Sequence, residues 1–572
     1  MSCVAHAGAI CTRSRKQVHT LLVLRWLVVS LLALLVYLPG ASARFSNTAE
    51  CQEALVVWEM VESGNWVLPR INGEQIPSKP PLYHWIAIGF ANLTGGVSEL
   101  SARLPSMAAA AATVGLVFVA GSAEWGAVAG TVGAVALATS PEWVKWATTA
   151  RTDATFVFFL TCAFLLGERW LRSGRSSALV GLAAATGAAT LAKGFAGAAL
   201  VGVVLLVEIW RRGAWRLLRL RDLAAASVIF SAIACSWYAA ALAQAGVAFF
   251  QKQIILENVL RFFPYEKGGP SRQHSRLFYL PMLFTGMLPW SLALPAALWR
   301  GGGERTPTAR SSGFSGYLVG WLTIVFLVCT AASGKRTNYL LPLYPAAALL
   351  IGRELSALLD RSPSRAPSRA LSIAGVLAAL VALLVASLLV AWRLGLAPWQ
   401  PLIPFLHPQD RVLLPRMIDR LGPPNAIVVA LAIVIALALS AATLQRAWRE
   451  LYVLVGSTAV LLTVAGCSIA NVLEAELKSF APFTERVAST VGGAPLAFFR
   501  APDLAVLFYL RRHVAVERGA FATIHRPGWA LVWQKDWDAL AAKDRDPAEV
   551  LDTSPPASVG RPDTRLLLVR LR

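Results

Sequence analysis

Long apolar runs are the feature that most constrains the fold of this chain. Runs of about 17–25 residues recur between residues 18 and 471, and each could cross a hydrocarbon layer about 30 Å thick. Charged residues make up 15% of the 572 residues, against roughly 25% in soluble domains. The sequence therefore predicts a protein that crosses a membrane many times.

We predict thirteen membrane-spanning helices from these runs. They cover about residues 18–40, 101–121, 125–141, 154–171, 176–192, 195–210, 222–243, 276–298, 314–332, 339–357, 369–392, 425–444 and 451–471. The apolar segment 81–96 is assigned instead to a helix at the outer interface, because counting it as a span would invert every later loop. Ala-Ser-Ala at 41–43 is typical of signal cleavage, but the run before it is longer than a usual signal, which favours a retained span.

The arginines set the orientation of these spans. With the N-terminus inside, nearly every cytoplasmic loop is rich in arginine, as the positive-inside rule expects. The formal net charge of +21 also fits nucleic-acid binding, but the basic residues lie in short loops between apolar runs. We therefore expect membrane lipids as neighbours and no nucleic acid as partner.

The residues from about 472 change in character and are predicted to lie outside. Short strand-like segments occur at 494–499, 514–517, 529–534 and 565–571, with helix-like segments at 503–513 and 535–544. The predicted fold is an all-α polytopic membrane domain at 1–471, with interfacial first-loop helices at about 46–98. A small extracytoplasmic α/β domain follows at 472–572, with a mostly parallel sheet.

The predicted outer loops collect the polar residues that could carry chemistry. They hold Glu50, Lys79, Arg151, Asp153, Lys193, Glu257, Asn258, Arg261, His274, Lys335, Arg336, Asn338 and Tyr339. A general base needs a carboxylate near the reacting hydroxyl, and a phosphate leaving group needs Lys, Arg or Tyr donors. ATP is absent outside the cell, so an activated donor there would arrive as a lipid phosphate. The pattern favours lipid-phosphate-linked group transfer, although charged groups at helix ends also serve as interfacial anchors.

Several motifs also resemble a known family in type and order. These are "EMVESGNWVLPRING", "KPPLYHW", "ARLPS", "LAKG", "ENVLRF" with a following His before "LPWSL", and "KRTNYLLPLYP". The series, over about residues 20–360, resembles the aminoarabinose transferases of lipid A modification and the wider protein O-mannosyltransferase-like group of GT-C glycosyltransferases.

This resemblance implies a GT-C fold and an inverting transfer of a sugar. The donor would be a polyprenyl-phosphate sugar, and the acceptor a lipid A-like molecule or another cell-envelope lipid or glycan. The reaction would occur on the periplasmic face of the bacterial inner membrane. In the family a first-loop carboxylate deprotonates or orients the acceptor, and cations and a tyrosine hold the phosphate. The resemblance also implies a divalent metal ion in some members.

The family's functional positions are only partly retained here. Its first-loop Asp-Glu pair becomes Ala49-Glu50, its following arginine becomes Gln52, and the glutamate before the "KPPL" lysine becomes Ser78. We predict Glu50 and Asp153 as catalytic residues. The predicted phosphate-binding residues are Lys79, Lys193, Arg261, Lys335, Arg336 and Tyr339. His274 is the candidate ligand of a divalent metal ion, although Ser78 removes a probable second ligand.

Simpler interpretations and other functions stay open. Glu50 could be an interfacial charge, Asp153 could cap a helix, and Arg261 could pair with Glu257. The missing aspartate keeps open a catalytically degenerate member that binds lipid phosphate. A transporter is a weaker alternative, because the sequence contains no inverted repeat and no mid-span charge pair.

Overall fold

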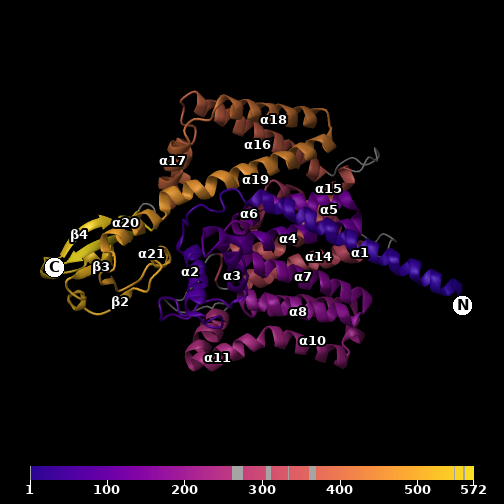
Figure 1. Ribbon diagram of the computed structural model, residues 1–572. Coiled ribbons are helices and arrows are strands. Elements are labelled where there is room, and N and C mark those ends of the chain that lie inside the picture. Colours follow the sequence, from indigo (N-terminus) through magenta and orange to yellow (C-terminus); the bar gives the residue numbers. More distant parts are fainter. Residues whose placement is uncertain are drawn as a thin grey trace.

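The computed structural model describes residues 2–260, 275–303, 311–332, 334–359, 369–406, 408–546, 548–557 and 561–572. Most of this is a bundle of helices (Figure 1). The bundle helices are α1 (Ser2–Tyr37), α4 (Glu99–Trp125), α5 (Ala127–Ala138), α6 (Pro141–Ala147), α7 (Thr152–Ser173), α8 (Ser176–Lys193), α9 (Ala196–Arg212), α10 (Leu220–Ile233), α11 (Cys235–Phe249), α12 (Tyr279–Gly286), α13 (Leu294–Gly303), α14 (Ser311–Ala331), α15 (Tyr344–Leu359), α16 (Arg369–Arg393), α17 (Pro408–Leu421), α18 (Ala426–Leu444) and α19 (Trp448–Lys478). The connecting turns are η1 (Ala214–Leu217), the π-helix η2 (Phe250–Val259), η3 (Arg276–Phe278), η4 (Trp290–Ala293), η5 (Thr337–Leu343) and η6 (Gln400–Phe405).

The prediction of a polytopic helical membrane protein is confirmed. Within the described ranges, 8 helices are long and apolar enough to cross a membrane, or up to 9 with one bent pair. A helix or helix pair occurs at each of the thirteen predicted positions, but some of these helices are shorter. In the region predicted at 222–243, the span-length helix runs instead from Cys235 to Val259.

The span predicted at 276–298 is not straight. Tyr279–Gly286 and Trp290–Arg300 form a pair bent by 112°. Pro289 lies in this break, and proline cannot donate the backbone hydrogen bond that would continue a helix. The apolar pattern predicted the two halves but not the angle between them.

Small residues allow the central helices to pack closely. A Cβ atom on Gly130 of α5 would come within 2.4 Å of the carbonyl oxygen of Phe118 in α4. A Cβ atom on Gly352 of α15 would come within 2.4 Å of the carbonyl oxygen of Ala129. Such close backbone approach is how helices associate in a membrane, where no hydrophobic effect drives them together.

The first loop and the C-terminal region form a second packed body at one end of the bundle (Figure 1). The first loop contributes α2 (Thr48–Ser63) and α3 (Leu82–Thr94). The C-terminal elements are α20 (Ala481–Val491), β1 (Leu496–Phe499), α21 (Leu504–Leu510), β2 (Ala515–Glu517), η7 (Phe521–Thr523), β3 (Gly528–Trp533), α22 (Gln534–Asp538), α23 (Ala542–Arg545), β4 (Ala548–Thr553), η8 (Pro562–Thr564) and β5 (Leu566–Leu571). One hydrophobic core joins Leu55 and Met60 of α2 to Phe508 and Leu568 of the C-terminal region.

The C-terminal sheet has the strand order β2-β1-β3-β5-β4. β1 pairs in parallel with β2 and β3, whereas β5 runs antiparallel to both β3 and β4. The prediction of a mostly parallel sheet is therefore wrong, because β5 lies between β3 and β4 and runs antiparallel to both of these strands. The sequence analysis also missed β4, an edge strand whose polar segment "AEVLDT" lacks an apolar alternation.

The division of the chain at residue 472 stays a prediction. Helix α19 passes through this position without a break and ends at Lys478.

Candidate active site

Three distant motifs meet at Asp153, in the first turn of α7. Its Oδ1 accepts hydrogen bonds from Lys193 Nζ, at the end of α8, and from Asn338 Nδ2 of η5 at 2.7 Å. Asp153 is 1% exposed, and Arg151 Nε lies 3.7 Å from its Oδ2. In the described part of the chain, Oδ2 accepts no hydrogen bond. One carboxylate thus binds two donors and lies beside the Arg151 guanidinium, in a buried site at the end of the bundle beside the first loop.

Aromatic rings hold the Lys193 ammonium from the side. The ammonium lies 5.3 Å from the ring centres of both Phe156 and Tyr339. A cation over a ring face is attracted by the ring's quadrupole, more strongly when water is excluded. Tyr339 therefore shapes the site through its ring, a contact that the sequence analysis did not foresee.

Glu50 and Lys335 are bound by other groups of the protein. Glu50 is buried and forms an ion pair with Arg103, with Nε 2.9 Å from Oε1. The same Oε1 accepts the backbone N–H of Ala150 at 2.9 Å. Lys335 is buried and donates to the carbonyl oxygen of Ala332 at 2.8 Å, next to the end of α14. Their predicted roles in catalysis and phosphate binding stay predictions.

Lys79 pairs with the π-helix η2. Its Nζ lies 3.3 Å from Glu257 Oε2, and both side chains are largely buried. Gln52 and Ser78, two departures from the family pattern, contact each other, with Gln52 Nε2 donating to Ser78 Oγ at 3.3 Å. The positions of the family's arginine and glutamate are therefore neighbours in space, and this chain has replaced both with a neutral pair.

The residues do not fit a metal site in the part of the chain that the structure describes. Ser78 offers a neutral hydroxyl that Gln52 already occupies, and no group of three His, Cys, Asp or Glu side chains is close enough to hold an ion there. His274, the predicted ligand, and Arg261, a predicted phosphate contact, lie outside the described residues.

Sequence reasoning missed a buried pair formed by Glu53 and His84. Glu53 Oε2 lies 2.8 Å from His84 Nε2, and both side chains are buried. Burial opposes ionisation of Glu53, but the hydrogen bond from His84 and the positive charges of His84, Arg151 and Lys79 outweigh it. The pKa of Glu53 therefore lies below its usual value, and this carboxylate adds negative charge behind Arg151.

A cavity of about 700 Å³ lies beside these groups. We call it the cation-lined cavity, because Lys145, Arg151 and Arg336 contribute to its wall. Ala49 lines it as well, and α19 provides a largely apolar side from Ala459 to Glu474. The cavity thus combines cations suited to a phosphate with an apolar wall suited to a lipid.

With this arrangement established, the class of protein follows from comparison with solved structures. The crystal structure titled ArnT from Cupriavidus metallidurans bound to undecaprenyl phosphate matches with a TM-score of 0.70 and 23% identity, covering 96% of this chain and 97% of that one. This likeness establishes the fold, and the chain is a polytopic membrane protein with the GT-C fold.

Comparisons of the sequence with known families and proteins indicate which glycosyltransferases this chain resembles. Residues 78–239 match the family of dolichyl-phosphate-mannose-protein mannosyltransferases. The undecaprenyl phosphate-alpha-4-amino-4-deoxy-L-arabinose arabinosyl transferase of Edwardsiella ictaluri (strain 93-146) is 28% identical over 57% of this chain and 58% of that protein. The undecaprenyl phosphate-alpha-4-amino-4-deoxy-L-arabinose arabinosyl transferase 1 of Pseudomonas fluorescens (strain Pf0-1) is 28% identical over 59% of this chain and 59% of that protein. The chain thus matches less than two thirds of the length of these relatives.

Proposed function

We propose that this protein transfers a sugar from a polyprenyl-phosphate donor to a lipid A-like or other cell-envelope acceptor. The reaction would occur with inversion on the periplasmic face of the bacterial inner membrane. The observation that carries this proposal is the convergence of Lys193, Asn338 and Arg151 on Asp153 beside the cation-lined cavity. The relatives are named for 4-amino-4-deoxy-L-arabinose carried on undecaprenyl phosphate, so we propose a donor of that class.

The cations would stabilise the leaving group. When the bond between the anomeric carbon and the phosphate oxygen breaks, the phosphate takes the electron pair and gains negative charge. Preorganised donors in a site that excludes water lower the energy of such a charge. Lys193 is held by one carboxylate and two rings, so its ammonium is positioned before the donor arrives. We propose Lys193, Arg151 and Arg336 as the phosphate contacts, with Lys79 in support.

We assign different tasks to the two predicted carboxylates. Asp153 would hold Lys193 and Asn338 in place through its Oδ1, while its Oδ2 lies buried 3.7 Å from Arg151 Nε. Glu50 would position α2 and the backbone at Ala150, because Arg103 and Ala150 occupy its carboxylate. Ala49 leaves a methyl group where the family pattern has its leading base, so the carboxylate in reach of the acceptor must come from elsewhere.

The test is turnover by the purified protein in lipid nanodiscs. The substrates are undecaprenyl-phosphate aminoarabinose and lipid A, and the product is identified by mass spectrometry. Lys193→Met and Asp153→Asn should each lower turnover at least about 100-fold. Lys535→Met, at an exposed position on α22, is the matched control and should retain turnover.

One observation favours a second function, binding without transfer. Residue 49, which lines the cation-lined cavity, is an alanine where the family pattern has an aspartate. Saturable binding of undecaprenyl phosphate together with no transfer to any envelope acceptor would establish this function and contradict the first.

A further inference from the structure

The end of α9 and the start of α10 form an arginine-rich surface at the cytoplasmic end of the bundle. Residues 210–221 read "WRRGAWRLLRLR" and contain five arginines, two tryptophans and no carboxylate. The 3-10 helix η1 lies within this segment. Helix α7 is long enough to span the membrane from Asp153 on the outer face, and its other end packs beside this segment. We call residues 210–221, together with Arg175 in the turn between α7 and α8, the arginine surface.

Buried carboxylates neutralise the arginines nearest the bundle. Glu208 of α9 is fully buried, and its Oε2 lies 2.6 Å from Arg211 Nη2 and 2.9 Å from Arg212 Nε. Arg212 Nη2 also lies 2.7 Å from Oε2 of Glu168, a buried residue of α7. This network ties the end of α9 to the end of α7 and so fixes the backbone from which the rest of the surface projects.

A second set of arginines has no such partner. Four exposed arginines form no ion pair within the part of the chain that the structure describes: Arg175, Arg216, Arg219 and Arg221. Like charges at a surface repel one another and raise the local concentration of anions from solution. The arginine surface therefore favours an anionic partner.

Helix η1 is fixed on the bundle with its charged side outward. Residues three apart lie on the same side of a 3-10 helix, and Ala214 and Leu217 both pack against the main hydrophobic core. A Cβ atom on Gly174, in the turn between α7 and α8, would lie 3.3 Å from Leu217 Cδ2. Trp215 is turned outward and is 52% exposed, and Trp210 at the end of α9 is 72% exposed. Because tryptophan is enriched at the level of the lipid headgroups, these rings place the arginines at that depth.

We propose that the arginine surface binds the phosphate of an anionic phospholipid in the cytoplasmic leaflet. The guanidinium groups would donate paired N–H groups to the phosphate oxygens. A soluble polyanion would also meet the positive charge, but it would leave Trp210, Trp215 and the 84% exposed Leu220 in water. A phospholipid satisfies both halves of the surface, because its acyl chains cover the apolar side chains. This inference is independent of the proposed function.

The variant that tests the site combines Arg216→Gln, Arg219→Gln and Arg221→Gln. Native mass spectrometry of the protein in a neutral detergent, titrated with phosphatidylglycerol, measures the dissociation constant of the lipid. An arginine near an anionic lipid surface contributes roughly 5-fold in affinity, so the triple variant should bind phosphatidylglycerol about 100-fold more weakly. Phosphatidylcholine, whose headgroup has no net charge, should bind weakly to both proteins.

A matched control removes the same charge from the other end of the molecule. Arg561, Arg565 and Arg570 are exposed in the C-terminal region, which lies beyond the first-loop end of the bundle (Figure 1). The combination of Arg561→Gln, Arg565→Gln and Arg570→Gln should keep the affinity for phosphatidylglycerol within about twofold, because charges further apart than a Debye length of about 10 Å are screened.

A conservative variant and thermal unfolding separate a lost site from a damaged fold. Arg216→Lys, Arg219→Lys and Arg221→Lys together keep the charge but lose the planar donors, so this variant should lose less than about 10-fold in affinity. Phosphatidylglycerol should also raise the Tm of the wild-type protein, because a ligand that binds the folded state stabilises it. The glutamine variant should match the wild-type Tm without the lipid and gain much less when the lipid is added.

Two results would overturn the inference. Equal affinity of the wild-type protein for phosphatidylglycerol and phosphatidylcholine would show that the surface does not select an anionic lipid. Equal affinity of the wild-type protein and the glutamine variant for phosphatidylglycerol would place the bound lipid elsewhere. None of these measurements uses sugar transfer, so their outcome leaves the proposed function untouched.

Discussion

Arg103 and Glu50 form a two-point ion pair between α4 and the first loop. Arg103 Nε lies 2.9 Å from Glu50 Oε1, and Nη2 lies 3.1 Å from Oε2. The carboxylate also accepts the Ala150 N–H and a hydrogen bond from the side chain of Asn47 at 3.1 Å. The same arginine donates to the carbonyl oxygens of Ala41 and Ala43. This pair therefore fixes the start of the first loop against α4 and the segment before Asp153.

Glu50→Gln should act mainly on stability. Breaking a buried ion pair leaves one charge without compensation and costs about 3–5 kcal/mol. We expect a clear fall in Tm in detergent, and the double variant with Arg103→Met should lose less than the sum of the single variants. Unchanged Tm with kcat lowered at least about 100-fold would instead establish Glu50 as a catalytic residue.

Lys193→Met should weaken binding of the donor. A hydrogen bond to a charged group is worth about 1.5–3 kcal/mol, which corresponds to roughly 10- to 150-fold in affinity. This loss of affinity is measured as equilibrium binding of undecaprenyl phosphate to the protein in nanodiscs. Lys535→Met is the control. Equal affinity in the two variants would remove Lys193 from the phosphate site.

Asn72 should prove important for the contact between the first loop and the C-terminal region. Its Oδ1 accepts the Val514 N–H at 2.9 Å, and its Nδ2 donates to the Val514 carbonyl at 2.8 Å. Its φ angle of 53° lies in the left-handed region, which costs alanine about 1–2 kcal/mol but not glycine. Asn72→Ala should therefore be less stable than Asn72→Gly by about 1 kcal/mol, although both lose the hydrogen bonds. Thermal unfolding distinguishes them, and equal stabilities would contradict the role of the backbone conformation.

Asp503 should make the stability of the C-terminal region depend on pH. Its Oδ1 caps α21 by accepting the N–H groups of Ala505 and Val506 at 2.8 and 3.1 Å. Burial raises its pKa from 3.8 to about 6, and these two hydrogen bonds offset only part of that effect. The folded state thus retains a proton that the unfolded state loses. The contribution to stability is fully present below about pH 4 and is lost as pH rises to about 6, a change of about 3 kcal/mol.

Hydrogen exchange of the α21 amides measures this dependence. Protection should fall between pH 4 and pH 6, after correction for the intrinsic exchange rate. Asp503→Asn keeps a capping oxygen but does not titrate, so its protection should be flat over this range. A parallel decline in both proteins would assign the dependence to another group.

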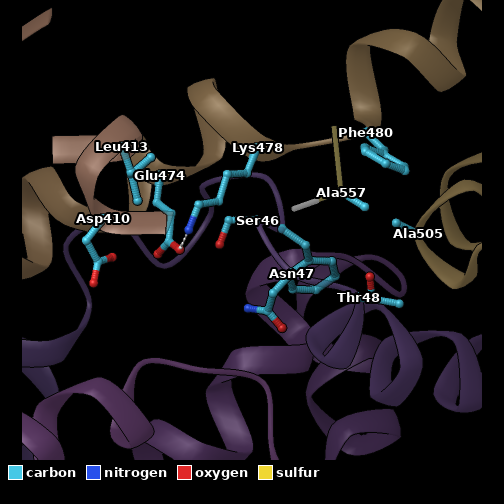
Figure 2. Close-up of a pocket in the computed structure, with 11 residues that line it drawn as sticks. Ser46, Asn47, Thr48, Asp410, Leu413, Glu474, Lys478, Phe480, Ala505 and Ala557 are labelled. Carbon is cyan, nitrogen blue, oxygen red and sulfur yellow. Dashed lines mark hydrogen bonds and ion pairs between the residues drawn. The ribbon is translucent and has the colours of Figure 1, made fainter. Parts of the chain in front are cut away.

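Topology explains why Asp153, Lys193 and Asn338, which the sequence analysis singled out, lie together in the structure. Asp153 begins a predicted span, Lys193 ends another and Asn338 begins a third, so orientation alone places them at one face. The partners of the first loop could not be found in this way. His84 lies 31 residues from Glu53 and Arg103 lies 53 residues from Glu50, and each pairing is set by how α2 packs on α3 and α4. The cavity of about 260 Å³ that Asn47, Asp410 and Glu474 line (Figure 2) was equally hidden, because its walls come from regions more than 300 residues apart.

The hydrophobic core that joins α2 to the C-terminal region has a consequence for biosynthesis. Domains generally fold from the N-terminus as the chain is made. Here Leu55 and Met60 emerge early, but Phe508 and Leu568, which share their core, are translated more than 400 residues later. The first loop can therefore pack fully only after the intervening helices have been inserted. Assembly of the site is thereby coupled to synthesis of the C-terminal region, and a ribosome that stops before that region leaves the first loop without its partner.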